Sequence, residues 1–200
     1  YNFILRNNIR PHKEIERYVP KPYDTPEMLG MKWQMDVKYV PAACYSGEIP
    51  QKFYQYTVID EASRERFIYP YLEQSSFSTV DFLNRAIAYF GYKPKTVQTD
   101  NGAEFTHIVK SNRVHPLDVL CHKLGIEHKR IRPRTPRHNG KVERSHRNDQ
   151  ERFYNHLKFF SLKDLITQME RYRRRSNNIP MQTLNWLSPI EKRKRLMQVV

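Results

Sequence analysis

Three acidic residues stand where metal ligands would be useful in this 200-residue sequence. Asp36 lies within an alternating apolar and polar run, Asp100 ends a short predicted strand, and Glu143 follows a basic stretch. Taken singly, each has an ordinary explanation, as a strand residue, an Asx turn and a glutamate stabilised by a helix dipole. Hard divalent cations such as Mg²⁺ and Mn²⁺ prefer carboxylate oxygens, however, so the three together would suit such an ion.

The sequence around these residues resembles one known family. The motifs are MKWQMDVKYV at 31–40, QTDNGAEF at 98–105 and TPRHNGKVERSHR at 135–147. They are similar to the three acidic motifs of the DDE-type catalytic core that bacterial insertion-sequence transposases share with retroviral integrases. TVIDEASRERFIYPY at 57–71 resembles the strand pair after the first motif, and WLSPIEKRK at 186–194 resembles the closing segment of the bacterial transposases. The resemblance covers residues 31–194, and its second and third motifs are the specific ones.

The resemblance implies metal-dependent DNA strand cleavage and strand transfer, with Asp36, Asp100 and Glu143 as the catalytic and metal-binding residues. Such a reaction needs an in-line attack while charge accumulates on the phosphoryl oxygens. Two divalent ions about 3.5–4 Å apart can activate the nucleophile and stabilise the leaving oxygen. In the family arrangement Asp36 would bridge two Mg²⁺ or Mn²⁺ ions, with Asp100 completing one site and Glu143 the other.

Two departures from the family pattern concern the third motif. Asp100 and Glu143 are 43 positions apart, which is longer than the usual family spacing. Glu127 is nearer, but it lies in or beside a predicted strand and lacks the NGKVER context, so we reject it as the third ligand. The family often has a basic residue two turns after the glutamate, whereas this sequence has Gln150.

The basic residues around the third motif predict a DNA surface. The chain has 35 Lys and Arg against 21 Asp and Glu, a formal net charge of +14 and a sequence pI of about 9.8. A protein this basic attracts polyanions, of which nucleic acid is the most common. We expect phosphate contacts, which position DNA without reading its sequence, from Arg132, Arg134, Arg137, His138, Asn139, Lys141, Arg144 and Arg147. The expected partners are the element ends, the target DNA and further copies of the chain.

Local patterns predict the elements that position these residues. Alternating or β-branched runs predict strands at 31–40, 53–60 and 66–71, joined as an antiparallel meander, and shorter ones at 95–99 and 126–131. A helix capped by Ser78 or Thr79 runs through Phe90, with Val80, Leu83, Ile87 and Phe90 as its apolar stripe and Gly91 at its end. Another runs from Pro116 to Gly125, and two more follow Gly140 and Ser161. This order predicts an α+β or mixed α/β layout. The family resemblance implies the α/β, RNase H-like fold, a five-stranded mixed sheet flanked by helices.

Composition limits the organisation and the setting of the chain. Residues 1–30, rich in proline, read as a linker or arm from a missing N-terminal domain, 31–176 as the catalytic core and 177–200 as a basic C-terminal extension. Cys44 and Cys121 are expected as free thiols, and no His and Cys pairing has zinc-finger spacing. No run reaches membrane-spanning length and no signal peptide is evident, which indicates a cytoplasmic, nucleoid-associated protein, of bacterial type by its closing segment.

Two rival functions remain open at this stage. An RNase H-like nuclease that only hydrolyses DNA would use the same ligands, and the NGKVER motif and the WLSPIE segment favour a transposase over it. A domesticated, non-catalytic DNA-binding protein would keep the basic surface, but it would have no need of Asp36, Asp100 and Glu143.

Overall fold

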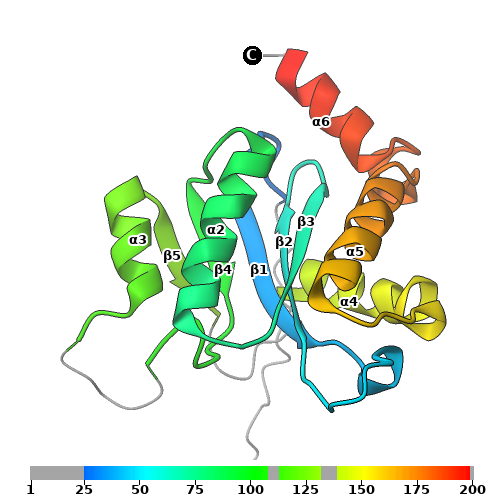
Figure 1. Cartoon of the computed structure of the whole chain (residues 1–200). Helices are drawn as coiled ribbons and strands as arrows, with labels where there is room; N and C mark the ends of the chain where they lie inside the picture. Colours follow the sequence, from blue (N-terminus) through cyan, green and yellow to red (C-terminus); the bar gives the residue numbers. More distant parts are fainter. Residues whose placement is uncertain (1–24, 108–112, 132–138, 199–200) are drawn as a thin grey trace, which may run out of the picture.

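A five-stranded mixed sheet forms the centre of the protein in a computed structural model that describes residues 25–107, 113–131 and 139–198 (Figure 1). Strands β1 (Lys32–Tyr39), β2 (Tyr54–Asp60) and β3 (Arg66–Tyr71) form the predicted antiparallel meander. Strands β4 (Thr96–Thr99) and β5 (Glu127–Arg130) are added parallel to β1, which gives the order β3-β2-β1-β4-β5. The predicted five-stranded mixed sheet is confirmed.

Helices cover both faces of this sheet (Figure 1). Helices α2 (Ser76–Phe90) and α3 (Pro116–Leu124) lie on one face, and α4 (Gly140–Arg152) and α5 (Leu162–Asn177) lie on the other. Helix α6 (Pro189–Gln198) follows α5. Three short 3₁₀ turns are η1 (Ala42–Cys44), η3 (Tyr154–His156) and η4 (Gln182–Leu184). The helices expected after Pro116, Gly140 and Ser161 are therefore present, with Ser161 capping α5.

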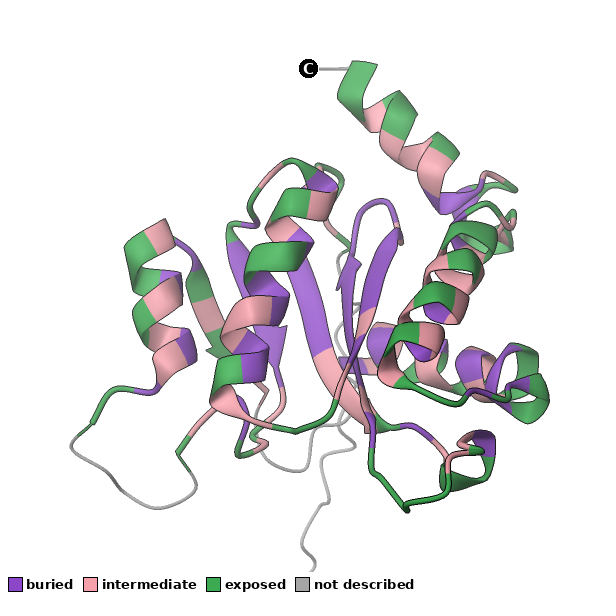
Figure 2. Ribbon diagram, viewed as in Figure 1, coloured by how far each residue is buried: buried purple, intermediate pink, exposed green. Residues whose placement is uncertain are grey.

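Each face of the sheet has its own apolar core. The first core joins the sheet to α2 and α3 and contains Trp33, Met35, Phe82 and Phe90. The second core includes Phe153, Phe159 and Leu165 and lies under α5 and the segment that precedes it. Figure 2 shows the central strands as buried along most of their length. Strands covered on both faces position their side chains rigidly, which matters for any ligand that they carry.

Helix α2 begins earlier than predicted. Its N-cap is Ser75, whose hydroxyl accepts a hydrogen bond from the Ser78 amide at 3.1 Å, so the prediction of Ser78 or Thr79 as the cap is wrong. The predicted stripe is also partly wrong, because Phe82 and Ala86 are buried, whereas Val80 and Ile87 are only half-buried. The side chains of Ser78 and Thr79 are buried instead as first-turn residues. Gly91 ends the helix in the left-handed conformation as expected.

The first half of strand β1 is buried on both faces, whereas an alternating pattern predicts burial on one face only. Trp33 and Met35 are fully buried in the first core, as the alternation predicts. Gln34, on the opposite face, is only 1% exposed because α4 lies over it, while Tyr39 at the end of the apolar face is 59% exposed. The polar face of β1 therefore meets α4 at Gln34 and not solvent.

The C-terminal segment packs back onto the core. Arg193 of α6 contacts the carboxylate of Glu65 at 3.1 Å and donates to the Phe90 carbonyl at 2.6 Å. Cys44 and Cys121 are free and buried, which confirms the two thiols. No helix in the described ranges is long and apolar enough to cross a membrane. Residues 1–24 of the predicted N-terminal arm lie outside the described residues.

Candidate active site

Asp36 and Asp100 come from neighbouring parallel strands and lie at the same level. Strand β1 pairs with β4 through Lys32 with Thr96 and Gln34 with Gln98. Asp36 is two residues beyond Gln34, and Asp100 is two residues beyond Gln98, so the register brings the two aspartates side by side. The carboxyl ends of parallel strands are where α/β sheets commonly bind their ligands.

The turn after β4 holds the Asp100 carboxylate in a defined direction. Its Oδ1 accepts a hydrogen bond from the Gly102 amide at 2.9 Å, and Asn101 donates to the Ile131 carbonyl at 3.0 Å. The Gly102 backbone approaches Glu104 so closely that a β-carbon there would lie 2.6 Å from Glu104 Oε2. A larger residue at 102 would therefore disturb Glu104, which accepts a hydrogen bond from Gln74 at 2.6 Å.

Glu143 reaches this region from the first turn of α4. Its side chain is exposed, and its charge is one of those that act on Asp36. Glu127, by contrast, pairs with Thr96 at the opposite end of β4 from Asp100 and accepts a hydrogen bond from Thr96 at 2.8 Å. Glu127 therefore lies away from Asp100.

Burial and neighbouring charge strongly perturb Asp36. Burial, opposed only by a hydrogen bond from the Val37 amide, combines with the charges of Asp100, Glu143 and Glu104 to raise the pKa of Asp36 to about 7. Burial and nearby negative charge both disfavour the ionised carboxylate, and shifts of this kind are common at functional sites.

Glu104 and His146 belong to this cluster, although the sequence did not single them out. Glu104 is buried, and its charge contributes to the Asp36 pKa. His146 Nδ1 lies 3.5 Å from Asp36 Oδ2, while its Nε2 lies 3.0 Å from the Thr57 hydroxyl. Burial lowers the pKa of His146 to about 4, so this imidazole is neutral at neutral pH. Its position three residues after Glu143, on the same side of a helix, was the only signal available.

The donor set suits a hard divalent cation, but the ligands are not drawn together. Within residues 25–107, 113–131 and 139–198, no three His, Cys, Asp or Glu side chains lie close enough to hold an ion as they stand. Asp36 and Asp100 are fixed by strands, whereas Glu143 is an exposed side chain on a helix. A cation between the aspartates would relieve the repulsion that raises the Asp36 pKa, and Glu143 is the side chain with the freedom to close the site.

Gln34 connects the two halves of this site. Its Oε1 accepts hydrogen bonds from the backbone amides of Lys141 and Val142, at 3.1 and 3.2 Å, in the first turn of α4. Its Nε2 donates to Glu61 at 2.9 Å, and the fully buried Glu61 pairs with Lys141. The strand that carries Asp36 is thereby attached directly to the helix that carries Glu143.

The residues predicted to contact DNA divide into three groups. Arg132, Arg134, Arg137 and His138 lie outside the described residues. Asn139 is buried at the start of α4, and Lys141 contacts Glu61 and Thr25. Arg144 and Arg147 are exposed on α4. Gln150, at the expected basic position, lies 3.4 Å from the Lys38 ammonium group.

Solved structures of known proteins share this fold. A chain of the simian T-cell lymphotropic virus intasome, solved in complex with PP2A regulatory subunit B56 gamma, is 17% identical with a TM-score of 0.67, covering 90% of this chain and 60% of that one. The HTLV-2 integrase catalytic core domain in complex with magnesium is 17% identical with a TM-score of 0.60, covering 83% of this chain and 97% of that one. The BIV integrase catalytic core domain is 18% identical with a TM-score of 0.62, covering 85% of this chain and 97% of that one. The chain is an RNase H-like domain of the type found in integrase catalytic cores.

Sequence comparison then gives the family. Two families described as Integrase core domain match residues 27–136 and 124–189. The putative integrase ORF3 of Spiroplasma virus SpV1-C74 is 30% identical over 149 residues, 70% of this chain and 40% of that protein. The retrovirus-related Pol polyprotein from transposon TNT 1-94 of Nicotiana tabacum is 31% identical over 111 residues, 54% of this chain and 8% of that protein. This chain belongs to the integrase core domain family, and it spans less than half the length of these relatives.

Proposed function

We propose that this domain catalyses metal-dependent cleavage of a DNA strand and its transfer to a second DNA molecule, with Asp36, Asp100 and Glu143 as metal ligands. The observation that carries the proposal is the alignment of Asp36 with Asp100 on adjacent parallel strands, close enough to Glu143 for its charge to act on Asp36. The relatives with integrase in their names and the HTLV-2 core domain solved with magnesium add support.

Each carboxylate would have its own task. Asp36, on which the charges of the other two act, would serve both ions, while Asp100 and Glu143 would each complete one site. Bound Mg²⁺ or Mn²⁺ would supply the activation of an attacking hydroxyl and the neutralisation of charge on the phosphoryl oxygens. The protein contributes position, because β1 and β4 fix the aspartates and the turn at Asn101 and Gly102 aims Asp100. The expected assembly is an oligomer that holds element ends and target DNA together.

A joining assay tests the proposal. The full-length protein is incubated with labelled element ends, an acceptor plasmid and Mg²⁺ or Mn²⁺, and joined products are measured. Asp36→Asn, Asp100→Asn and Glu143→Gln should each reduce joining by roughly 100-fold or more. Losses on this order are expected when the stabilisation of charge by a bound ion is removed. Glu151→Gln, which removes a charge from an exposed position on the same helix, is the matched control and should retain activity.

The rival functions give different products in the same assay. A nuclease that only hydrolyses would release cut ends without joining them to the plasmid. A non-catalytic DNA-binding protein would shift the labelled DNA and give neither product. Full joining by any of the three carboxylate variants would remove that residue from the proposed site.

A further inference from the structure

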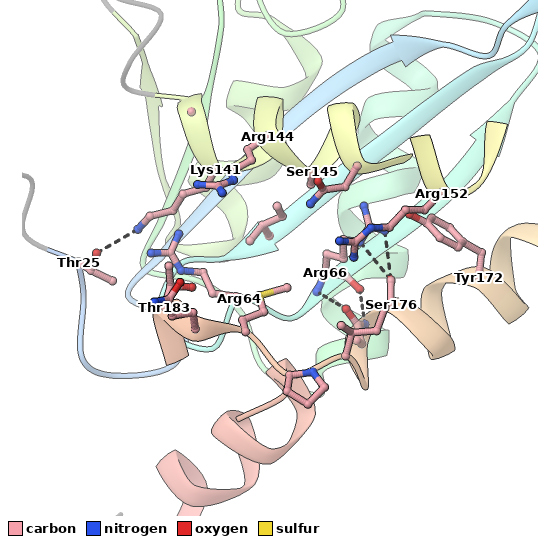
Figure 3. Close-up of a pocket in the computed structure, with 18 residues that line it drawn as sticks. Thr25, Arg64, Arg66, Lys141, Arg144, Ser145, Arg152, Tyr172, Ser176 and Thr183 are labelled. Carbon is pink, nitrogen blue, oxygen red and sulfur yellow. Dashed lines mark hydrogen bonds between the residues drawn. The ribbon is translucent and has the colours of Figure 1, made fainter. Parts of the chain in front are cut away.

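A basic cavity of about 550 Å³ lies beside α4, between that helix, the β2–β3 turn, the C-terminal half of α5 and the segment that follows α5 (Figure 3). Five cationic side chains line it, and no carboxylate is among the described residues of its wall. The remaining polar lining consists of hydroxyl and amide side chains. The five basic residues are Arg64, Arg66, Lys141, Arg144 and Arg152.

The cavity lies on a different side of α4 from the candidate active site. Each residue of an α-helix advances by roughly 100°, so Arg144, Asn148 and Arg152 lie well round the helix from Glu143. His146 and Gln150, by contrast, share the Glu143 side and contact Asp36 and Lys38. One helix therefore serves two separate regions.

Two of the cations in the cavity pair with buried carboxylates. Arg66 pairs with the fully buried Asp149 at 2.6 Å, and Lys141 pairs with the fully buried Glu61. Both carboxylates lie behind the lining, where solvent does not reach them. Arg144 and Arg152 are exposed lining cations in addition to these two pairs, and they add positive charge to the wall of the cavity.

We propose that this cavity binds phosphate groups, and that their source is the backbone of a DNA strand lying along α4 on the side away from Glu143. Arginine guanidinium groups match phosphate oxygens in geometry and charge, and neighbouring hydroxyls and amides add donors. From Lys141 to Arg152 the helix extends about 16 Å, at 1.5 Å per residue. One DNA strand carries a phosphate about every 3.4 Å along its axis, so this length suits a run of phosphates better than a single ion.

The proposal rests on the proposed function in one respect, that DNA is the partner. Free phosphorylated compounds share the same chemistry and are the alternative source. The test therefore uses two probes on the full chain, a duplex DNA and inorganic pyrophosphate.

The test compares two variants with the same change of charge. Arg144→Gln with Arg152→Gln removes two cations from the cavity, whereas Arg171→Gln with Arg175→Gln removes two exposed cations from α5 outside it. The slope of log affinity against log salt should become shallower by up to about 1.8 in the cavity variant, at roughly 0.9 for each phosphate that the variant no longer neutralises. The control should keep the wild-type slope. Pyrophosphate should raise the melting temperature of the wild type and the control but not that of the cavity variant.

Every outcome decides the matter. The cavity variant could lose protection by pyrophosphate and yet keep the wild-type slope for DNA. That result would retain the phosphate site but make a free phosphorylated compound its ligand. Equal flattening in both variants, or full pyrophosphate protection in the cavity variant, would overturn the proposal. Asp36→Asn should lose joining yet keep the wild-type slope, so failure of the proposed function and failure of the cavity proposal give different results.

Discussion

At the scale of the residue, burial and neighbouring carboxylates strongly perturb Asp36, one of the three proposed ligands. Its pKa of about 7 means that, without metal, about half of the molecules carry a proton there at neutral pH. Burial is the first cause, and the charges of Asp100, Glu143 and Glu104 add to it. A divalent cation reverses this balance, because it favours the charged carboxylate that burial disfavours. Burying a carboxylate that could bind metal therefore makes the metal-free fold less stable.

The Asp36 pKa predicts a pH-dependent effect of Asp36→Asn on stability. The folded protein holds the proton more tightly than the unfolded chain, whose ordinary Asp pKa is 3.8, so ionisation of Asp36 lowers the free energy of unfolding as pH rises from about 4 to about 7. The variant has no such decrease. With each pKa unit corresponding to about 1.4 kcal/mol, it should be more stable than wild type by about 2–4 kcal/mol at pH 8.

Urea unfolding in EDTA at pH 5 and pH 8 measures this difference. The stability gap between variant and wild type should widen from pH 5 to pH 8. Added Mg²⁺ at pH 8 should stabilise the wild type far more than the variant, since ligand binding to the folded state adds stability. A gap that does not change with pH would contradict the assigned pKa.

At the scale of the element, the relation between β1 and α4 depends on Gln34. Its side chain satisfies two of the amides that every helix leaves without partners in its first turn, and Glu61 holds it in place. Asn139, at the N-cap position, makes no such side-chain hydrogen bond. A distant strand residue thus replaces the local cap and sets the distance between Asp36 and Glu143.

Gln34→Leu should weaken catalysis through position rather than through folding alone. We expect joining to fall by about 10-fold or more, and the Mg²⁺ concentration for half-maximal activity to rise, because a 1 Å misplacement of a catalytic group can cost on the order of 100-fold. Phe82→Leu, in the first core on the opposite face of the sheet, is the control for reduced stability. It should keep the wild-type Mg²⁺ requirement, and the same rise in both variants would refute a positioning role for Gln34.

Local sequence signals predicted the elements, and tertiary contacts account for what they missed. The strand around Asp36, the Gly91 and Gly125 helix ends and the Ser161 cap depend on a few neighbouring residues, and the structure has them all. The burial of Gln34 depends on a helix more than 100 positions away. Ser75 was missed because its backbone carbonyl and amide are held by the hydroxyl of Tyr56, a residue of β2 that is distant in sequence. Glu104 lies within the quoted second motif, but its proximity to Asp36 follows only from the sheet.

At the scale of the whole molecule, the net charge of +14 is spread over regions with different tasks. Several cations stabilise the fold itself, since Arg66 pairs with Asp149, Arg193 with Glu65 and Lys141 with Glu61. Net charge alone therefore overstates the surface available to DNA. The number of phosphate contacts, which the salt dependence of binding measures, is the more informative quantity.

The predicted basic loop before α4 gives the last test at this scale. If Arg134 and Arg137 contact phosphates, replacing both by Ala should make the slope of log affinity against log salt shallower by up to about 1.8 and weaken all DNA sequences about equally, because phosphate contacts carry no sequence information. Lys194→Ala with Arg195→Ala, which removes two exposed cations from α6, is the matched control and should change the slope little. Binding of duplexes of different sequence is measured by fluorescence anisotropy across a salt series. A slope equal to that of the wild type would remove Arg134 and Arg137 from the DNA surface, and weakening confined to one sequence would mean that they read bases instead.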